Sequence, residues 1–283
     1  MVARERTYPV TAICRALEVS RAGVHERLRR EKRSKRGFYR KADDDLLLSA
    51  IRRIVSERPT YGYRRVWAIL NRLRKGKELD PVNKKRVYRI MKKYDLLLQP
   101  SGITRRPRLH DGKVSVISSN VRWCSDALEL SCRNGDVITV TFVIDAYDRE
   151  VMAYEAHLGR GVTSRTVQDL LVRSVEARFG DIKAPHAVEF LTDNGSCYAA
   201  KETRICASAL GLVSCFTPVR SPQSNGLAEA FVKTFKRDYA MNYTLTDGAF
   251  VLSAIDGWFE DYNLNHPHSA LGYRSPTEVR TSA

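Results

Sequence analysis

The sequence predicts a basic, helical front half followed by an α/β layered domain. Charge divides the chain: residues 1–120 hold 32 Lys+Arg and 12 Asp+Glu, a net charge of +20, whereas residues 121–283 hold 16 and 20, a net charge of −4. Apolar residues recur with helical period up to about residue 98 and with strand period after about residue 120. Residues 99–117, rich in Pro, Gly and Arg, are typical of a linker between the two parts.

Composition excludes several classes of protein. Apolar residues make up 43% of the 283 residues, which excludes a wholly disordered chain. No apolar run reaches 18 residues and the start lacks the pattern of a secretory signal, so we expect a soluble cytoplasmic protein with no membrane partner. The six cysteines form no Cys-x-x-Cys pair, which favours reduced thiols over a zinc finger. The excess positive charge of the front half indicates binding to a polyanion, nucleic acid above all.

Residues 1–41 predict two short helices. Ser20 is suited to cap the second, which runs from Arg21 to about Arg30 and carries several arginines. The pattern resembles a helix-turn-helix, whose second helix enters the major groove of DNA. A basic hairpin on the protein surface fits the same residues equally well, so both interpretations stay open. The first helix has an apolar stripe made of Val10, Ile13, Cys14 and Leu17.

Residues 42–98 predict a domain of three helices. The first begins near Asp43, the second follows Tyr61-Gly62-Tyr63-Arg64-Arg65, and the third begins near Asn83. Each helix has an apolar stripe for a core, in which we place Trp67, and a basic outer face. Three basic faces in succession favour contacts with DNA phosphates over mere solvation. The residues that we expect to make these contacts are Arg64, Arg65, Lys84, Lys85 and Arg86; Arg72, Arg74 and Lys75 extend the second face.

Residues 118–283 predict the α/β domain, with a helical extension at its end. Three consecutive strands come first, and then helices alternate with two further strands, which gives layers of helices on a sheet. The predicted strands span residues 121–130, 137–145, 151–157, 187–192 and 212–217. The predicted helices span residues 164–180, 199–210 and 227–239, the first of them capped by Thr163 or Ser164 and ended by Gly180.

Three carboxylates stand where this domain would hold a ligand. Asp126 interrupts the first strand, Asp193 ends the fourth, and Glu229 lies near the start of the last helix. If the first and fourth strands are neighbours, Asp126 and Asp193 converge, and Glu229 supplies a third carboxylate from above. Such hard oxygen ligands suit Mg²⁺ or Mn²⁺. Two of these ions about 4 Å apart would catalyse cleavage or transfer of phosphodiesters.

Two further sets of residues lie near these carboxylates. Lys233 and Lys236 follow Glu229 by four and seven positions, so they share its helical face and are candidate DNA contacts. Asp145 also ends a strand and is a rival ligand from the residues alone. A role in forming a turn and pairing with Arg149 is the competing interpretation.

The spacing of these residues is similar to that of the DDE transposase and retroviral integrase superfamily. It consists of two aspartates, then 35 residues between Asp193 and Glu229, and a lysine seven positions after Glu229. Local motifs resemble the OrfB-type transposases of bacterial insertion sequences, and the resemblance runs from about residue 43 to residue 280. The motifs are Trp123-Cys124-Ser125-Asp126, Thr192-Asp193-Asn194-Gly195, Ser221-Pro222-Gln223-Ser224-Asn225-Gly226-Leu227-Ala228-Glu229, Arg58-Pro59-Thr60-Tyr61-Gly62-Tyr63-Arg64-Arg65 and Tyr262-Asn263 with His266-Pro267-His268-Ser269-Ala270-Leu271-Gly272-Tyr273.

The resemblance implies an RNase H-like core, a five-stranded mixed sheet, in which Asp126, Asp193 and Glu229 are both catalytic residues and ligands of two Mg²⁺ or Mn²⁺ ions. It also implies cleavage at transposon ends, joining to a target duplex, a homo-oligomer on DNA, and a cytoplasmic, nucleoid-associated location. A partnership or frameshift fusion with the product of an upstream frame is expected too. The chain departs from retroviral integrases in having no His/Cys set for an N-terminal zinc module, and His266 stands where many relatives have Arg.

Two other functions remain as alternatives. One is a DNA-binding regulator of transposition without catalysis, against which the three intact carboxylates argue. The other is an RNase H-like nuclease without strand transfer, against which the basic front half argues.

Overall fold

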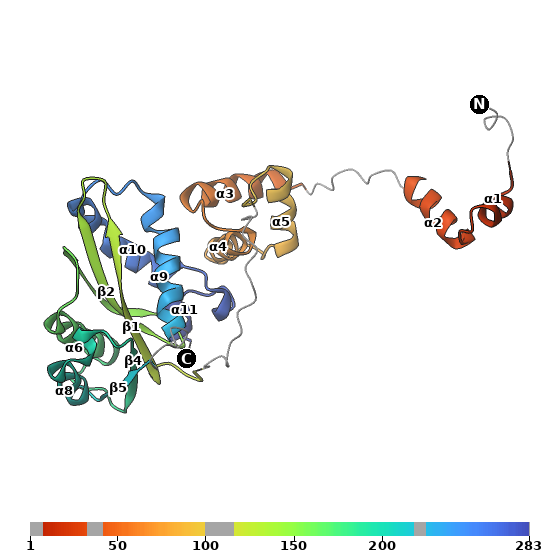
Figure 1. Cartoon of the computed structure of the whole chain (residues 1–283). Coiled ribbons are helices and arrows are strands. Elements are labelled where there is room, and N and C mark those ends of the chain that lie inside the picture. Colours follow the sequence, from red (N-terminus) through yellow and green to blue (C-terminus); the bar gives the residue numbers. More distant parts are fainter. Residues whose placement is uncertain (1–7, 33–41, 100–115, 218–224, 283) are drawn as a thin grey trace. The chain divides into compact units, whose positions relative to one another are not determined.

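The computed structural model describes residues 8–32, 42–99, 116–217 and 225–282, with side chains described up to residue 27 in the first range (Figure 1). Most of the predicted linker and residues 221–224 of the longest motif therefore lie outside the described residues. The chain forms two compact units, residues 1–47 and 48–283. The three-helix segment thus shares a unit with the α/β domain from Leu48 onward.

The front unit contains the two predicted helices, α1 (Val10–Ala16) and α2 (Arg21–Lys32). Ser20 caps α2 as predicted, because its hydroxyl oxygen accepts a hydrogen bond from the backbone N–H of Gly23 at 3.0 Å. The predicted apolar stripe of α1 is largely exposed: Cys14 is buried, whereas Ile13 and Leu17 are 39% and 65% exposed. The described part of this unit therefore has very little core of its own.

Three helices follow where the sequence predicts them: α3 (Asp44–Glu57), α4 (Tyr63–Lys75) and α5 (Lys84–Lys93). Asn83 caps α5, since its side-chain oxygen accepts the N–H of Lys85 at 2.9 Å. Trp67 is half-buried, and its indole N–H donates to the carbonyl of Val82 at 2.7 Å, which agrees with a structural role. The buried residues of the three stripes are Ile51, Ile54, Val66, Leu70, Val87, Ile90 and Met91.

A mixed five-stranded sheet forms the centre of the α/β domain, as predicted. Its order is β3-β2-β1-β4-β5; β1 pairs antiparallel with β2, and β2 with β3, whereas β1, β4 and β5 run parallel. The conditional expectation that the first and fourth strands are neighbours is confirmed. The strands are β1 (Arg122–Ser131), β2 (Val137–Asp145), β3 (Val151–Leu158), β4 (Val188–Thr192) and β5 (Leu212–Phe216).

Helices cover both faces of the sheet (Figure 1). One face packs on α6 (Ser164–Phe179), α7 (Ser196–Ala199) and α8 (Lys201–Ala209), and the other on α9 (Gly226–Asp238) and α10 (Gly248–Asn265). A short α11 (Pro276–Arg280) follows. The helix predicted over residues 199–210 begins too early. Ala200 adopts extended backbone angles, so α8 begins at Lys201 and residue 199 belongs to the separate helix α7. No helix among the described residues is long and apolar enough to cross a membrane.

Three arginines of the helical segment bind carboxylates of the α/β domain. Arg65 reaches Asp238, whose side chain is fully buried, and this partly removes the basic face predicted for α4. Arg72, on the same face of α4, also pairs with a carboxylate, that of Glu278. Beside these pairs the buried Tyr61 hydroxyl lies 3.0 Å from Nδ1 of the buried His266. The ion pairs are Arg58–Asp261 at 2.5 Å, Arg65–Asp238 at 2.7 Å and Arg72–Glu278 at 2.7 Å.

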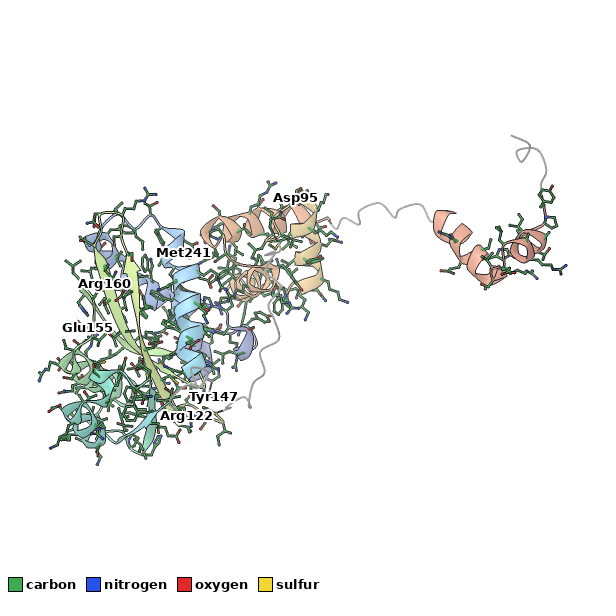
Figure 2. All side chains as sticks on the ribbon, in the orientation of Figure 1. Asp95, Arg122, Tyr147, Glu155, Arg160 and Met241 are labelled. Carbon is green, nitrogen blue, oxygen red and sulfur yellow. The ribbon has the colours of Figure 1, made fainter. Side chains whose placement is uncertain are left out.

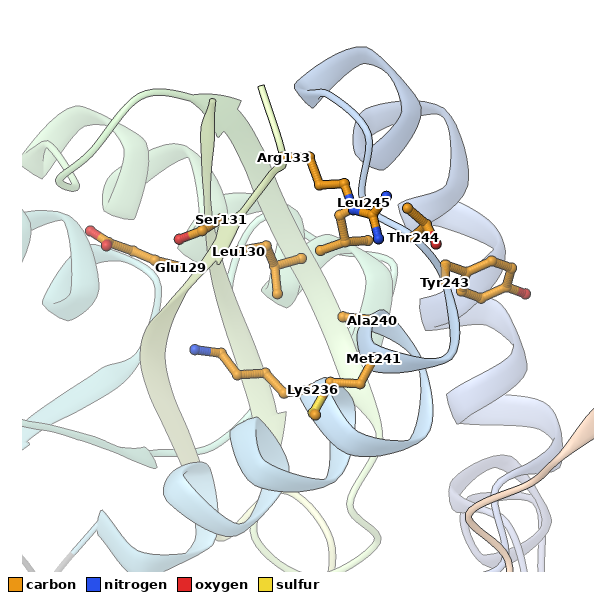
Figure 3. Close-up of a pocket in the computed structure, with 10 residues that line it drawn as sticks. All are labelled: Glu129, Leu130, Ser131, Arg133, Lys236, Ala240, Met241, Tyr243, Thr244 and Leu245. Atoms are coloured by element: carbon orange, nitrogen blue, oxygen red, sulfur yellow. The ribbon is translucent and has the colours of Figure 1, made fainter. Parts of the chain in front are cut away.

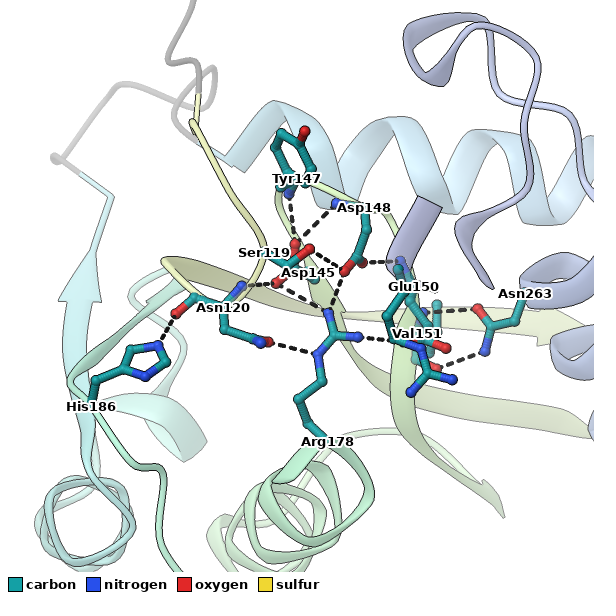
Figure 4. A network of polar contacts seen from close by, with 11 residues as sticks. Ser119, Asn120, Asp145, Tyr147, Asp148, Glu150, Val151, Arg178, His186 and Asn263 are labelled. Atoms are coloured by element: carbon teal, nitrogen blue, oxygen red, sulfur yellow. Dashed lines mark hydrogen bonds and ion pairs between the residues drawn. The ribbon is translucent and has the colours of Figure 1, made fainter. Parts of the chain in front are cut away.

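A second charged network holds the start of the α/β domain together (Figure 4). Arg178 of α6, 3% exposed, lies 2.6 Å from Asp148 and 3.3 Å from Asp145, and it also pairs with Glu150. Asp145 forms the predicted turn by accepting the N–H groups of the two residues that follow Ala146. The predicted partner Arg149 is wrong: Asp145 pairs with Arg178, from a helix far along the chain. Burial raises the pKa of Asp145, and the neighbouring Asp148 raises it further.

Replacing Arg178 by Met is expected to lower the free energy of unfolding by about 3–5 kcal/mol, because the buried carboxylates of Asp145 and Asp148 lose their cation. Urea denaturation measures this change. Arg165→Met is the matched control: Arg165 pairs with Asp169 at 3.1 Å, with side chains 81% and 57% exposed, and a change within about 0.5 kcal/mol is expected. Equal effects of the two substitutions would contradict a structural role for the Arg178 network.

Candidate active site

The pairing of β1 with β4 brings Asp126 and Asp193 together. The parallel register pairs Trp123 with Phe190 and Cys124 with Leu191. Continued by two residues, this register places the backbone of Asp126 beside that of Asp193. Asp126 is half-buried on the sheet and Asp193 is exposed just beyond the end of β4. The two carboxylates thus meet at the edge where parallel strands end.

The packing of α9 against β1 places the third carboxylate. Phe231 and Phe235 of α9 are buried in one cluster with Leu128 and Leu130 of β1. Because side chains alternate along a strand, Asp126 leaves β1 on the same face as Leu128 and Leu130. Glu229, in the first turn of α9, is half-buried, so it lies beside the buried face of the helix and not on its outer surface.

Ser125 connects β1 to both segments that carry the other carboxylates. Its fully buried hydroxyl lies 2.9 Å from the hydroxyl of Tyr198, in the helix that follows Asp193. Its carbonyl oxygen accepts a hydrogen bond at 3.1 Å from the side-chain amide of Asn225, the residue before α9. Both partners are buried. Ser125, Tyr198 and Asn225 therefore fix the relative positions of the three acidic residues.

A tight turn orients Asp193. Its Oδ1 accepts the backbone N–H of Gly195 at 3.0 Å, and the side chain of Asn194 donates to the carbonyl of Thr217 at 2.9 Å. A Cβ at position 195 would lie 3.0 Å from Oδ1 of Asp193, so the turn leaves little room for a side chain there. The Asp-Asn-Gly sequence thus holds the carboxylate by short-range bonds.

The two other acids affect the ionisation of Asp126. Burial raises the pKa of Asp126, and the negative charges of Asp193 and Glu229 raise it further, although the backbone N–H of Ala127 opposes the shift by donating at 2.8 Å. A divalent cation would remove this repulsion. The arrangement therefore favours a bound cation chemically.

The donor set fits Mg²⁺ or Mn²⁺ in a particular way. Among the described residues no group of three or more His, Cys, Asp or Glu side chains lies so that it could hold a metal ion by itself. Mg²⁺ does not need one, since in nucleotide-processing sites it binds one or two carboxylates and takes its other ligands from water and substrate phosphates. Asp126 and Asp193, on neighbouring parallel strands, are the carboxylates that the sheet brings nearest to such a site.

The predicted DNA-contact residues of the helical segment lie in different settings. Lys84 and Lys85 are exposed in the first turn of α5, and Arg86 is half-buried. Arg64 is exposed, and its Nε donates to the hydroxyl of Tyr63 at 3.1 Å. Arg65 instead points to Asp238. The structure supports a basic surface at Arg64 and α5 but offers no support for a DNA contact by Arg65.

The two lysines of α9 also differ from each other. Lys233 is exposed and lies 3.5 Å from Glu229, one turn away. Lys236 is half-buried, and no carboxylate partner for it occurs in the described parts of the chain. Lys236 is therefore the cation of α9 that remains available to a phosphate.

Sequence reasoning missed the residues that position the site. Ser125 and Asn225 lie inside the quoted motifs next to the acids, but their own side chains gave no sign of a partner. Tyr198 lies five positions after Asp193, and a tyrosine in an apolar helix is indistinguishable from an ordinary core residue. The one signal in the sequence that could have identified Ser125 and Asn225 was their position next to the acids within the motifs.

Comparison with known families matches the chain along most of its length. An HTH-like domain model matches residues 42–106, which include α3, α4 and α5. Models of the integrase core domain match residues 118–222 and 211–276, and so cover the sheet and the three acids.

Two transposases are similar to the chain over nearly its whole length. The InsD transposase of insertion element IS2A/D/F/H/I/K from Escherichia coli is 48% identical over 275 residues, covering 96% of this chain and 91% of the relative. InsD of IS2-9 from E. coli strain K12 is also 48% identical, covering 96% and 89%. Among solved structures, the catalytic core domain of BIV integrase is 19% identical, with a TM-score of 0.41, over 58% of this chain and 95% of that one.

Replacing Asp126 by Asn is expected to stabilise the metal-free protein at neutral pH, because it removes a charge that burial and two neighbouring acids disfavour. The raised pKa of Asp126 means that the folded protein binds this proton more tightly than the unfolded chain. The wild type therefore regains stability as the pH falls through that pKa, and the advantage of Asp126→Asn shrinks. Urea denaturation of both proteins between about pH 7 and pH 4, with a chelator present, measures the difference. A difference that does not change with pH would contradict the repulsion.

Proposed function

The chain belongs to the integrase-core transposases of bacterial insertion elements, and from this premise we propose that Asp126, Asp193 and Glu229 catalyse cleavage at the ends of its element and joining of the ends to target DNA. The helix-turn-helix-like domain of such a transposase implies DNA binding. The observation that carries the proposal is the parallel pairing of β1 with β4, which places Asp126 beside Asp193, together with the packing of α9 against the face of β1 that bears Asp126.

The residues divide the catalytic work among them. Asp126, Asp193 and Glu229 would hold the divalent ions. When bound, Mg²⁺ or Mn²⁺ supplies charge that activates an attacking oxygen and stabilises a leaving one. The chain itself keeps the carboxylates at fixed positions through Ser125 and Asn225, so that little reorganisation is needed when DNA arrives. Water and a 3′-hydroxyl are interchangeable nucleophiles at such a site.

The basic residues serve to hold DNA. We propose that Lys84, Lys85 and Arg86 at the start of α5, with Arg64, contact phosphates of the element end. Lys233 and Lys236 would contact the strand that enters the catalytic site. Point charges of this kind set the position of the duplex but do not read its sequence.

The wider biology is part of the same proposal. Joining two ends of one element to a target requires at least two active sites, which favours a homo-oligomer on DNA. The chain would act in the bacterial cytoplasm at the nucleoid, alone or joined to the product of an upstream frame. Size-exclusion chromatography of the full chain with and without end DNA tests the first of these points.

Asp126→Asn, Asp193→Asn and Glu229→Gln are each expected to reduce cleavage and joining at least about 1,000-fold, since a bound ion contributes several kcal/mol to stabilising the transition state. Binding of end DNA is expected to stay within about threefold of wild type, because the removed charges do not bind phosphate directly. Cleavage of labelled end duplexes and gel-shift titrations measure the two effects. Near-normal joining by any variant with Mg²⁺ would exclude that residue from the site.

The double variant Lys84→Ala/Lys85→Ala is expected to weaken DNA binding and to flatten its salt dependence. Loss of two phosphate contacts lowers the slope of log Kd against log salt by about 1.8, because fewer counterions are released. Lys201→Ala/Arg204→Ala on α8 is the control. It also removes two positive charges, but α8 packs on the face of the sheet that is opposite to α9. If both double variants give the same slope, α5 does not bind the duplex.

A further inference from the structure

Among the three helices of the helical segment, α5 carries the highest density of positive charge. Its ten residues, Lys84–Lys93, include six Lys and Arg and no acidic residue. In α3, by contrast, two arginines stand among three acids, and one of the two, Arg53, pairs with Glu57 at 2.9 Å. The DNA backbone carries a negative charge on every phosphate, so α5 suits it better than α3 does.

The cations of α4 are largely bound within the protein. Arg65 and Arg72 pair with carboxylates of the α/β domain, and Nε of Arg74 donates to the carbonyl of Asp80 at 2.6 Å. A helix that enters the major groove of DNA must have its outer face free. In the described part of the helical segment this condition favours α5 over α4.

One face of α5 is exposed along the whole helix. It consists of Lys84, Lys85, Tyr88 and Lys92, which we call the α5 face. At 3.6 residues per turn these four residues fall within an arc of about 100° around the helix axis. The residues on the other side of the helix are buried in the core of the segment: Val87, Ile90 and Met91.

Lysines lie at both ends of the α5 face. None of its three lysines has a carboxylate partner in the parts of the chain that the structure describes. The next acidic residue along the chain, Asp95, lies beyond the end of the helix (Figure 2). Lys84 and Lys92 are separated by about 12 Å along the helix axis. The major groove of B-DNA is also about 12 Å wide, so these two lysines can reach the phosphates on its two sides.

Tyr88 lies between these lysines, and its ring is held in place. The residue is 40% exposed, and its ring meets that of Tyr63 edge-on, with centroids 5.0 Å apart and 67° between the planes. Tyr63 is held in turn by Arg64, whose Nε donates to the Tyr63 hydroxyl at 3.1 Å. The ring of Tyr88 is therefore fixed on one side and presents apolar surface to the solvent between the lysines.

We propose that α5 lies in the major groove of the element end and that Tyr88 reads the sequence there by packing on the methyl group of a thymine. This methyl is the apolar group that base pairs present in the major groove. The lysines of the α5 face bind phosphates on both sides, which positions the helix without reading the sequence. The inference rests on the proposed function, in which the helical segment binds DNA, and it adds a residue that distinguishes one sequence from another.

Selection from a library of random duplexes, with the full chain as the selecting protein, tests the proposal. The wild type is expected to enrich a motif containing a thymine that Tyr88→Ala no longer selects, while the other positions of the motif persist. Measured against a scrambled duplex, Tyr88→Ala is expected to lose at least about fivefold in preference for the motif, as one wrong base pair does. Tyr88→Phe keeps the ring and is expected to keep the preference. An unchanged motif with Tyr88→Ala would overturn the proposal.

A change in the DNA tests the same contact without altering the protein. Uracil in place of the selected thymine removes the methyl group alone, so it is expected to raise the Kd of the wild type about fourfold, as loss of one buried methyl-sized group does. The Kd of Tyr88→Ala is expected to stay the same. Gel-shift titrations of the two proteins on the two duplexes measure this coupling. No loss in the wild type, or an equal loss in both proteins, would exclude Tyr88 as the residue that contacts the methyl.

Two further variants separate reading of the sequence from charge and from the loss of a tyrosine as such. Lys85→Ala is expected to weaken binding to the motif and to the scrambled duplex by the same factor, because it removes a phosphate contact. Tyr243→Ala is the matched control: Tyr243 is an exposed tyrosine of the α/β domain, and its ring points away from the hollow between β1 and the end of α9 (Figure 3). This control is expected to select the wild-type motif. Loss of the same thymine with Tyr243→Ala would count against a specific role for Tyr88.

This proposal and the catalytic one fail in different ways. If the wild type cleaves and joins element ends but selects no thymine through Tyr88, the catalytic proposal stands and the reading of sequence by Tyr88 does not. If the wild type selects its motif through Tyr88 but does not cleave the ends with Mg²⁺ or Mn²⁺, the assignment of Tyr88 stands and the catalytic proposal fails.

Discussion

The two hydrogen bonds of Ser125 hold together the three segments on which the site depends. Side chains alternate along β1, so the Ser125 hydroxyl points to one face of the sheet and the Asp126 carboxylate to the other. The hydroxyl meets Tyr198 on the first face, and the carbonyl receives Asn225 at the start of α9. The contacts that position the acids are thus made by Ser125, which carries no part of the acidic site itself. A buried residue this small is also required, because a larger side chain would separate β1 from the helix that follows Asp193.

Much of the fold could be predicted from the sequence because its signals are local. Alternating apolar residues gave the five strands, and the caps at Ser20 and Asn83 gave helix starts. Prediction of the site needed one further assumption, that the first and fourth strands are neighbours in the sheet. The observed strand order agrees with this assumption. The family resemblance then supplied what periodicity could not, namely which of several acids at strand ends belong together.

The choice of partner for a charged side chain could not be predicted. Arg178 and Arg149 are equally plausible partners for Asp145 by charge, and the chain path alone decides between them. Arg65 illustrates the same limit, since an arginine in a basic helix suits a phosphate or a distant carboxylate equally well. A long-range ion pair leaves no periodic trace in the sequence. Charge patterns therefore located the basic half of the protein but could not tell a cation that pairs with a carboxylate, such as Arg65, from one that faces solvent.

The arginine pairs of the helical segment have a consequence for how such proteins exchange parts. Arg58, Arg65 and Arg72 lie in the segment that would recognise an element, whereas their carboxylates lie 173 to 206 residues further along the chain. A chimera whose new recognition segment lacks these arginines would lose all three ion pairs and would leave the buried Asp238 with Arg237 as its remaining arginine partner. Recognition and catalysis are thus not freely interchangeable modules, and a transplant of one must carry the matching acids of the other.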